Sequence, residues 1–401
     1  MASSASRYEV IVVGMGPAGA STAYELQKRG VSVLGLEKYT HPREKVCGGA
    51  LSARIVRILD PDFLSVVEEE VYGFRFTYGL DESYFVESSR PLAYMVMRSG
   101  FDAWLVQKAK HAGVEIHERE PVINVMAEAE GIRVITSQRQ YVGQVVVGAD
   151  GAKGVVTQHL FQTRPTRMVP ALESEVQCDT PELGLKLNNG QSPTYAVISL
   201  NAAKKGYGWI FPKHHGLSVG VGEFVRGECR PKRSFHQFSQ EEPVLQGLHV
   251  PAPLGHPIPV FQWSRIRKQR HGWLVKGRAL LVGDAGHLVD PLLGEGIYYA
   301  IRSGQIAAEH ITRFLREPHH PLTMYEGAVL AEFGKEFLIA SRLNRIIYGV
   351  PRSWHRWIGR TFPHAYQQVL HRYCQLLQGR ETYQSLWARI IRKLTTPCFQ
   401  R

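Results

Sequence analysis

Apolar and polar positions near the N-terminus follow the order strand, helix, strand. The run Val10–Val13 is wholly apolar and β-branched, which is typical of a buried strand. A glycine-rich segment at 14–19 and an Ala-rich helical stretch at 20–30 follow it, and the apolar run 31–36 predicts a second strand. We therefore expect a β-α-β unit, the building block of a parallel sheet covered by helices.

The glycines between the first strand and the helix have the spacing Gly-x-Gly-x-x-Gly. Gly14 permits a tight turn, Gly16 lets the backbone approach a pyrophosphate, and Gly19 lets the helix pack closely on the strand. The positive end of the helix would hold that pyrophosphate, and Glu37, after the second strand, would accept hydrogen bonds from a ribose diol. The complete order of elements predicts a dinucleotide site rather than a plain glycine turn.

The rest of the pattern alternates between strand and helix signals. Strand patterns occur at 71–86, 114–117, 122–126, 132–136, 141–148, 195–200, 207–211, 217–224 and 279–282. Helical patterns occur at 52–59, 103–112, 296–315 and 324–348, and the Pro-rich piece 251–259 predicts a loop or crossover.

These elements predict an α/β protein in which a β-rich (α+β) domain is inserted into a Rossmann-like nucleotide-binding domain. The nucleotide-binding domain is expected to comprise residues 1–70, 98–160 and 275–320, and the β-rich substrate domain residues 71–97 and 161–274. A basic helical segment at 321–401 completes the chain.

The composition is that of a folded globular protein, with 44% hydrophobic and 21% charged residues. The polar stretch 1–7 leaves no room for a targeting peptide, and no apolar run of about 18 residues predicts a membrane-spanning helix. Neither a zinc site nor a disulfide framework is expected, because the cysteines form no Cys-x-x-Cys pair, and a reducing cytoplasm fits. The five cysteines are Cys47, Cys178, Cys229, Cys374 and Cys398.

The net charge of +12 is concentrated at the C-terminal end. Residues 341–401 hold eleven Lys or Arg and a single acid, Glu381, so the remainder of the chain is nearly neutral. This lopsided charge does not indicate a nucleic-acid partner. Aromatic residues among the arginines are typical of a membrane interface, although a solvated helical face or a docking face fits the same composition. These aromatic residues are Trp354, Trp357, Phe362, Tyr366, Tyr373, Tyr383 and Trp387.

A second glycine-rich segment at 283–296 bears on which nucleotide is bound. The strand at 279–282 delivers Asp284 to the edge of the nucleotide crevice, where a carboxylate can hold a sugar hydroxyl; capping the next helix is the alternative role. A glycine-rich turn that opens a helix can also bring backbone N–H groups and partial positive charge to a reduced flavin ring. The segment favours FAD over NAD.

The segments 14–19, 150–151 and 283–284 resemble the three fingerprints of FAD enzymes built like p-hydroxybenzoate hydroxylase. Within that group, the segments 45–52, 207–213 and 290–300 resemble the geranylgeranyl reductase family, so that the resemblance covers residues 8–315. One departure is Ala152-Lys153, where the group usually shows a Ser and then an Arg. Because of this departure, the usual contacts of that loop stay an open question, whereas the FAD assignment is unaffected.

The resemblance implies a set of residues that hold FAD. They are Gly14, Gly16, Pro17, Ala18, Gly19, Glu37, Lys38, Cys47, Gly48, Gly49, Arg98, Asp150, Gly283, Asp284, Pro291, Gly294, Gly296 and Ile297. It also implies that the loop at Cys47 lies by the flavin and the substrate channel. For Arg98, the alternative to a flavin contact is a plain surface arginine.

Cys47, Tyr207 and Trp209 are the predicted catalytic residues. A small buried structural cysteine is the alternative for Cys47. Tyr207, Trp209 and Phe211 share one face of a strand, which suits a long apolar substrate and equally suits a sheet core. His287, inside the flavin-binding turn, is either a proton donor or a structural histidine.

The implied reaction is the reduction of isolated C=C bonds in a polyprenyl chain on a lipid, a diphosphate or a chlorophyll-type precursor. No second Gly-x-Gly-x-x-Gly segment is found, so the choice of electron donor, NADPH or a ferredoxin-like protein, stays open. A flavin monooxygenase or halogenase is the first rival, since it has a block similar to 207–212. An electron-transfer flavoprotein to quinone is the second, and the absence of an iron–sulfur cysteine pattern argues against it. We expect a cytoplasmic protein with peripheral contact to the inner face of a membrane.

Overall fold

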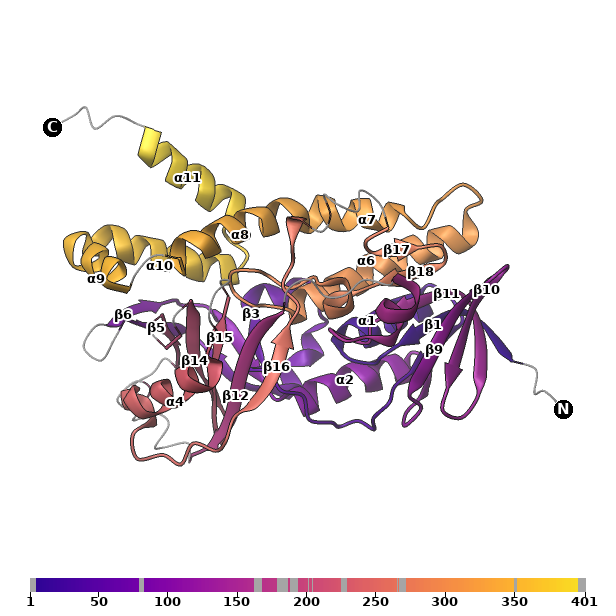
Figure 1. The fold of residues 1–401 in the computed structure, drawn as a ribbon, viewed down its shortest axis with the longest axis horizontal. Coiled ribbons are helices and arrows are strands. Elements are labelled where there is room, and N and C mark those ends of the chain that lie inside the picture. The colour runs from indigo at the N-terminus through magenta and orange to yellow at the C-terminus, as the bar shows by residue number, and fades with distance from the viewer. Residues whose placement is uncertain are drawn as a thin grey trace. The chain divides into compact units, whose positions relative to one another are not determined.

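The computed structural model describes residues 5–78, 83–161, 168–178, 187, 194–200, 202–203, 205–224, 229–264, 266, 272–349 and 352–395. Cys398 and parts of the expected β-rich segment 161–274 lie outside these residues. The chain forms two compact units (Figure 1). Unit 1 comprises Met1–Lys45, Arg98–Met168 and Pro257–Gly334, and unit 2 comprises Val46–Met97, Val169–His256 and Lys335–Arg401.

Unit 1 is built on a largely parallel sheet with the strand order β17-β18-β11-β1-β2-β8, and the hairpin β9–β10 is attached to β11 (Figure 1). The C-terminal halves of the central strands, Val10–Val13 of β1 and Val145–Gly148 of β11, are apolar and buried, as expected of parallel strands inside a domain. The strands are β1 (Ser6–Val13), β2 (Val33–Leu36), β8 (Glu115–His117), β9 (Val122–Glu128), β10 (Gly131–Thr136), β11 (Gln140–Gly148), β17 (Val275–Lys276) and β18 (Ala279–Leu281). The predicted α/β fold class is confirmed.

The first helix of unit 1, α1 (Pro17–Lys28), contacts both α2 (Arg98–His111) and α6 (Ile297–Arg316). Small residues allow α1 and α6 to approach closely: a Cβ at Gly304 would lie 2.6 Å from Thr22 Oγ1 and 2.7 Å from the Ala18 carbonyl oxygen. The predicted Rossmann-like β-α-β unit is therefore present as β1, α1 and β2. The helix α6 packs on the first turns of α1. The short helix α7 (Met324–Val329) follows α6.

Unit 2 contains a seven-stranded sheet with the order β16-β12-β15-β14-β13-β5-β6 and a three-stranded sheet with the order β3-β7-β4. Neighbours whose register is defined pair antiparallel, except β13 and β5, which pair parallel. The strands are β3 (Ala50–Ser52), β4 (Val67–Val71), β5 (Gly73–Thr77), β6 (Ser83–Glu87), β7 (Ala93–Val96), β12 (Val169–Gln177), β13 (Tyr195–Ser199), β14 (Gly206–Lys213), β15 (Gly216–Glu223) and β16 (Leu254–Ile258).

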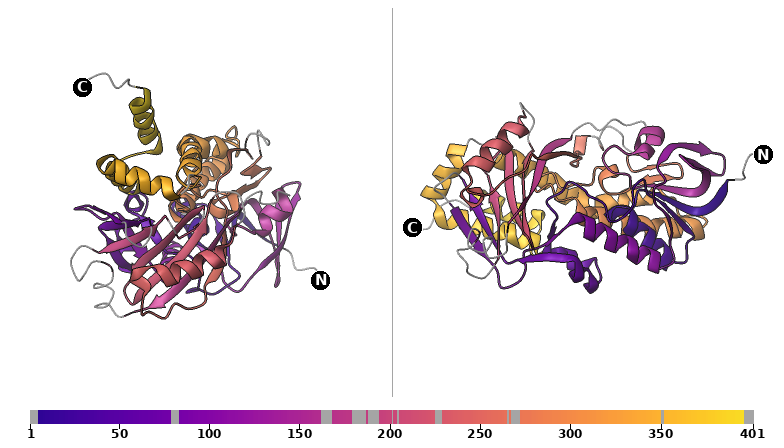
Figure 2. Two further views of the ribbon diagram at one scale, coloured as in Figure 1. Left: turned by 60° about the vertical axis from the view of Figure 1, so that its left-hand side comes forward. Right: turned by 90° about the horizontal axis from the view of Figure 1, so that it is seen from below.

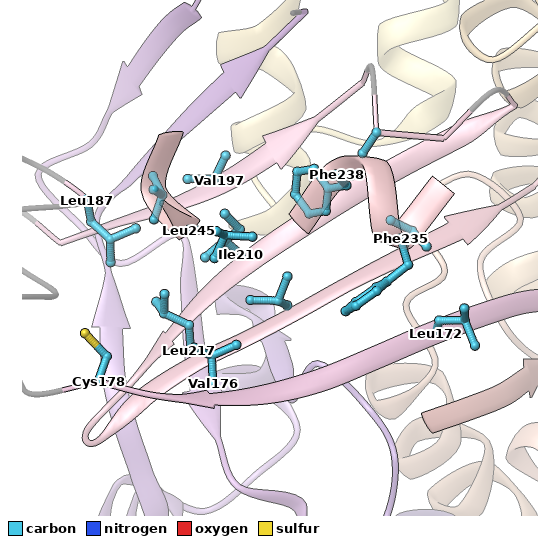
Figure 3. Packing of buried hydrophobic residues seen from close by; sticks show 14 residues of the cluster. Leu172, Val176, Cys178, Leu187, Val197, Ile210, Leu217, Phe235, Phe238 and Leu245 are labelled. Atoms are coloured by element: carbon cyan, nitrogen blue, oxygen red, sulfur yellow. The ribbon is translucent and has the colours of Figure 1, made fainter. Parts of the chain in front are cut away.

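The helix α4 (Pro231–Glu241) lies across one face of the seven-stranded sheet (Figures 1 and 2). Phe235 and Phe238 of this helix enter a buried cluster with Val197 and Ile210 of the sheet (Figure 3). A cluster of this kind is stabilised by the removal of apolar surface from water. One face of β14 is therefore committed to the core, and the opposite face is left for other contacts.

Four helices of unit 2 follow Gly334: α8 (Lys335–Ile347), α9 (Arg352–Thr361), α10 (Pro363–Leu377) and α11 (Tyr383–Thr395). The helix α10 contacts β6, and Tyr373 packs edge-on against Phe76 with ring centroids 5.5 Å apart. Tyr366 packs in the same way against Tyr78 at 5.3 Å. The helix α10 is thus anchored by aromatic side chains to the sheet of its own unit.

The structure differs from the sequence predictions in several elements. The piece 251–259 contains β16 instead of a pure loop, and its proline is tolerated because β16 is an edge strand. The piece 52–59 forms only the short 3-10 turn Ala53–Arg57. A π turn at Leu330–Gly334 divides the helix expected at 324–348 into α7 and α8.

The unit bounds also differ from the expected domain bounds, since residues 46–70 lie in unit 2. In the part of the chain that the structure describes, no helix is both long and apolar enough to cross a membrane.

Candidate functional site

The glycine turn of unit 1 has the geometry that a pyrophosphate requires. Gly14 has φ +92°, and a Cβ there would lie 2.6 Å from the Ala149 carbonyl oxygen. A Cβ at Gly19 would overlap the Gly14 carbonyl oxygen, so both positions require glycine. Gly16 precedes Pro17, the first residue of α1, and no side chain caps this helix end. The first-turn N–H groups of α1, including that of Ala18, are therefore placed to bind an anion.

Glu37 is held beside this turn by two backbone groups. Its carboxylate oxygens accept hydrogen bonds from the N–H of Met15 at 2.8 Å and from the N–H of Tyr39 at 3.1 Å. The side chain is buried. Because each carboxylate oxygen can accept a further hydrogen bond, this fixed acid can also hold a ribose hydroxyl. The neighbouring Lys38 is exposed, with its ammonium 4.8 Å from the centre of the Tyr39 ring.

Asp150 follows β11 and caps its own loop. One carboxylate oxygen accepts a hydrogen bond from the N–H of Val156 at 2.9 Å, and the other is buried without a partner among the described residues. Burial raises the pKa of Asp150 to about 6, although backbone N–H groups and the charge of Lys38 act to lower it. In this loop Ala152-Lys153 replaces the Ser-Arg pair that the family group usually shows. The hydrogen bond between Asp150 and the N–H of Val156 is nevertheless formed.

Asp284 lies in a 3-10 turn, Gly283–Gly286, that follows β18. This turn packs closely on α1, since a Cβ at Gly283 would lie 2.9 Å from the Ala18 Cβ atom. Asp284 does not cap α6, which begins at Ile297 after Gly296. No residue in the described part of the chain hydrogen-bonds to its carboxylate. Burial raises the pKa of Asp284, and the charges of Lys45 and Arg98 act to lower it.

The loop between Asp284 and α6 is organised by Asp290, which the sequence analysis did not select. Its fully buried carboxylate accepts hydrogen bonds from the N–H groups of Leu292 at 2.7 Å and Leu293 at 3.0 Å. Gly294, with φ +69°, donates its N–H to the Asp290 carbonyl oxygen at 3.0 Å. These bonds fix the loop that carries the predicted residues Pro291, Gly294, Gly296 and Ile297. His287 is buried and adopts a left-handed conformation at the end of the preceding turn.

Arg98 begins α2 and is buried, so it is not a plain surface arginine. Its guanidinium makes two hydrogen bonds to Asp102, from Nε to Oδ1 at 2.9 Å and from Nη2 to Oδ2 at 2.8 Å. Asp102 is fully buried and also pairs with Arg43 at 3.2 Å. The sequence analysis missed Asp102 and Arg43. The spacing Arg98-x-x-x-Asp102 in a helix was the available signal.

In unit 2, the loop Cys47-Gly48-Gly49 is braced by Lys213. The Lys213 ammonium donates hydrogen bonds to the carbonyl oxygens of Gly48 at 2.9 Å and Val96 at 2.8 Å. Gly49 has φ +66°, and a Cβ there would overlap the Val96 carbonyl oxygen. Cys47 is half-buried and accepts the Gly49 N–H at 3.5 Å from Sγ. Glycine is therefore required at position 49 by the close approach of β7 and Lys213.

Lys213 itself is buried at the end of β14. Burial lowers the pKa of its ammonium, while the acidic groups of Glu175, Cys47 and Glu173 act to raise it. The sequence analysis quoted Lys213 within a family-like segment but gave it no role. A lysine that ends a buried strand was the only signal, and its partners are more than 100 residues away in sequence.

The aromatic face of β14 meets the same loop. A Cβ at Gly48 would lie 2.8 Å from Trp209 Nε1 and 3.0 Å from the Phe211 ring. Trp209 is buried, and its Nε1–H has no hydrogen-bond partner among the described residues. Tyr207 stacks on Phe224 with ring centroids 5.3 Å apart. Because the opposite face of β14 packs against α4, this aromatic face is not part of that core.

The residues of unit 1 fit the adenosine-diphosphate and sugar parts of a bound FAD. The helix end at Gly16, which no side chain caps, suits a phosphate, and the buried carboxylate of Glu37 suits a ribose. The half-buried carboxylate of Asp284 accepts no hydrogen bond from the described residues. Among the described residues, no cluster of His, Cys, Asp or Glu could hold a metal ion. Cys47, Cys178, Cys229 and Cys374 form no disulfide bond with one another.

Comparison with known proteins agrees with FAD as the cofactor. The FAD binding domain family matches residues 7–322. A geranylgeranyl diphosphate reductase of Rhodobacter capsulatus is 27% identical over 328 residues, which cover 77% of this chain and 76% of that protein.

Two solved structures share the fold. A geranylgeranyl bacteriochlorophyll reductase-like protein of Thermoplasma acidophilum has a TM-score of 0.73 at 23% identity, covering 87% of this chain and 89% of that chain. The flavin-dependent brominase Bmp2 has a TM-score of 0.69 at 20% identity, covering 93% of this chain and 94% of that chain. With its glycine turn, buried acid and family match over most of its length, the chain belongs to the FAD binding domain family.

Proposed function

We propose that this protein is an FAD-dependent reductase that saturates isolated C=C bonds of a polyprenyl chain, such as a geranylgeranyl group. One observation carries the proposal. The two segments that resemble geranylgeranyl reductases in unit 2, residues 45–52 and 207–213, pack together through Gly48, Trp209 and Lys213. The similarity to a reductase of Rhodobacter capsulatus supports the same activity.

The reaction sets three requirements for the protein. An unconjugated alkene is a poor hydride acceptor, so the double bond must be oriented closely, kept away from water, and protonated on the second carbon as hydride reaches the first. Bound FAD, once reduced by the electron donor, would supply the hydride. The product gains one hydride and one proton for each double bond reduced.

The aromatic face of β14 would meet the first two requirements. Tyr207, Trp209 and Phe211 form a continuous row, with neighbouring ring centroids 6.1 Å apart, and β15 carries Gly220 beneath the Trp209 ring. A row of rings offers a long apolar surface that excludes water and fits an extended prenyl chain.

Cys47 would meet the third requirement. Its half-buried thiol lies in the loop that packs on the aromatic row, and it can donate its proton to the alkene carbon and recover one from water. Lys213 fixes this loop through the Gly48 carbonyl group, and it therefore positions Cys47.

The decisive experiment uses the FAD-loaded protein, reduced anaerobically with dithionite and mixed with geranylgeranyl diphosphate. Reoxidation of the flavin with a product heavier by two hydrogens per double bond supports the proposal. The reductant replaces the natural donor, so the result is the same whether NADPH or a ferredoxin-like protein serves in the cell. A flavin that stays reduced until air is admitted contradicts it and favours an oxygen-using monooxygenase or halogenase.

Two cysteine variants test the proton donor. Cys47→Ala should slow flavin reoxidation by prenyl substrate on the order of a hundredfold, which is the range of general acid catalysis. Cys229→Ala removes an exposed thiol of the same unit and should leave the rate unchanged. Equal rates for wild type and Cys47→Ala would assign the proton to another group.

We further propose that α9 contacts an anionic membrane surface from one side, without crossing it. Trp354 is 55% exposed, Trp357 is 56% exposed and Phe362 is 52% exposed, and their rings form a connected row. Arg356 and Arg360 are exposed on the same helix. Aromatic rings with cations suit the boundary between acidic headgroups and acyl chains, where a prenyl lipid would be found.

A further inference from the structure

Arg43, in the loop after β2, lies over the glycine turn of unit 1. A Cβ built on Gly16 would have one neighbour within 4 Å among the described residues, and that neighbour is Arg43 Nη2 at 3.4 Å. The guanidinium therefore stands directly beside the N-terminus of α1, which is the end with partial positive charge. The first turn of α1 contains no acidic residue that could balance these charges.

The loop that carries Arg43 is anchored on both sides of this position. Glu37 accepts the N–H of Tyr39, and Glu118 accepts the N–H of His41 at 2.8 Å. The His41 ring lies 2.9 Å from the same Glu118 oxygen. Arg43 is 14% exposed. Its position thus results from packing and hydrogen bonds, and it is not that of a free surface side chain.

The described residues around Arg43 do not provide acceptors for all the N–H groups of its guanidinium. Its Nη2 pairs with Asp102 at 3.2 Å, but Asp102 already receives both hydrogen bonds from Arg98. One carboxylate is thus divided between two guanidinium groups, and Arg43 receives the weaker share of it. The Nε–H of Arg43 is buried and has no hydrogen-bond partner in the described part of the chain. A buried charged donor without an acceptor is costly unless a ligand supplies one.

We propose that Arg43 binds the pyrophosphate of the dinucleotide at the Gly16 turn, together with the backbone N–H groups of α1. Planar guanidinium groups recognise phosphate oxygens with more than one N–H, and the positive charge of Arg43 matches the anion. The site is built before the ligand arrives, because Asp102 holds the guanidinium of Arg43 in place. The proposal rests on the FAD binding domain and is independent of the substrate.

The test measures nucleotide affinity of the protein after its flavin is removed, by calorimetry. Arg43→Gln should weaken FAD and ADP binding, each on the order of tenfold or more, as loss of a charge-assisted hydrogen bond predicts. Adenosine, which has no phosphate, should bind both proteins equally. The matched control is Arg29→Gln, which removes one positive charge at the other end of α1 and should bind ADP like wild type.

Three outcomes overturn the proposal. They are unchanged ADP affinity in Arg43→Gln, equal weakening for ADP and adenosine, and a loss confined to NADP⁺ while FAD binds normally. The third outcome would show that Arg43 binds the pyrophosphate of a nicotinamide electron donor instead of that of FAD. If Arg43→Gln does not fold, Arg43→Lys keeps the charge opposite Asp102 but lacks the Nε–H group. It should still bind ADP more weakly than wild type, and wild-type ADP affinity in this variant would equally overturn the proposal.

Discussion

The ammonium group of Lys213 donates a hydrogen bond to the carbonyl oxygen of Gly48 at 2.9 Å, across 165 residues of sequence. The same ammonium group binds the Val96 carbonyl oxygen, so one buried side chain joins the end of β14 to the Cys-Gly-Gly loop and to the end of β7. The loop that carries the predicted proton donor thus has its conformation set by a residue from another part of the chain.

Lys213→Met should destabilise unit 2. The change removes the donor from the buried Val96 carbonyl group, which costs about 1–3 kcal/mol, and from the half-buried Gly48 carbonyl group, which costs less, while removal of a buried charge offsets part of that cost. We expect a net loss of about 2 kcal/mol in the free energy of unfolding, measured by urea titration. Lys232→Met, at an exposed position on α4, is the control and should change stability little. A Lys213→Met protein as stable as wild type would show that the brace is dispensable.

Gly48→Ala should disturb the aromatic row. The new methyl group would lie 2.8 Å from Trp209 Nε1, so the indole ring or the loop must move, at a cost of about 1–3 kcal/mol. Trp fluorescence and thermal unfolding measure both effects. Gly100→Ala is the matched control, because a Cβ there meets nothing within 4 Å. Within helix α2 this control should be neutral or stabilising by about 0.5–1 kcal/mol. The same loss in both variants would contradict the packing argument.

Asp150 should make the folded protein without flavin less stable as pH rises from about 4 to 6. Burial raises the pKa of its carboxyl to about 6 in the folded state, while an unfolded chain keeps a value near 4. Between these values the folded protein binds a proton that the unfolded chain has lost, so its stabilising contribution is complete below pH 4 and disappears through pH 6.

Asp150→Asn cannot titrate and should lack this slope. The free energy of unfolding of wild type relative to the variant should fall by roughly 1–3 kcal/mol over that interval and then stay constant. Urea titrations at successive pH values measure it. Asp62→Asn, at an exposed position, is the control. Parallel profiles for wild type and Asp150→Asn would contradict the prediction.

Replacement of Trp354 and Trp357 by Ala should weaken vesicle binding. Wild type should sediment with vesicles that contain phosphatidylserine and remain free of vesicles of phosphatidylcholine alone, because cations on α9 require acidic headgroups. The double variant should lose on the order of tenfold in partitioning, since two large apolar side chains no longer enter the interface. Leu254→Ala removes another exposed apolar side chain, 65% exposed, and should bind as wild type. Equal binding to both vesicle types would exclude an electrostatic membrane contact.

Much of unit 1 could be predicted because its signals are local. The strand β1, the glycine turn and α1 follow from residues within one short stretch, and the apolar runs of β2 and β18 mark buried parallel strands. Predictions failed where several structures fit one pattern. The Pro-rich piece that contains β16 lacks alternation of apolar and polar residues. It is a strand because it pairs with β12, and its proline is tolerated because β16 lies at the sheet edge.

The aromatic row of β14 shows the same limit at the site. The alternation of Tyr207, Trp209 and Phe211 predicts a shared face, but the sequence does not indicate what that face meets. The structure answers through other elements: α4 covers the opposite face, and Gly48 comes within contact of Trp209 and Phe211.

The sequence by itself determined the FAD-binding turn, the acid after β2 and the positions of the buried strands β1, β2 and β18, because these depend on spacing and on local apolar periodicity. Only the tertiary structure decided that Lys213 braces Gly48 and that Asp102 shares its carboxylate between Arg98 and Arg43. Buried charges find partners wherever the packed chain brings them, and that pairing is a property of the whole fold that no local pattern encodes.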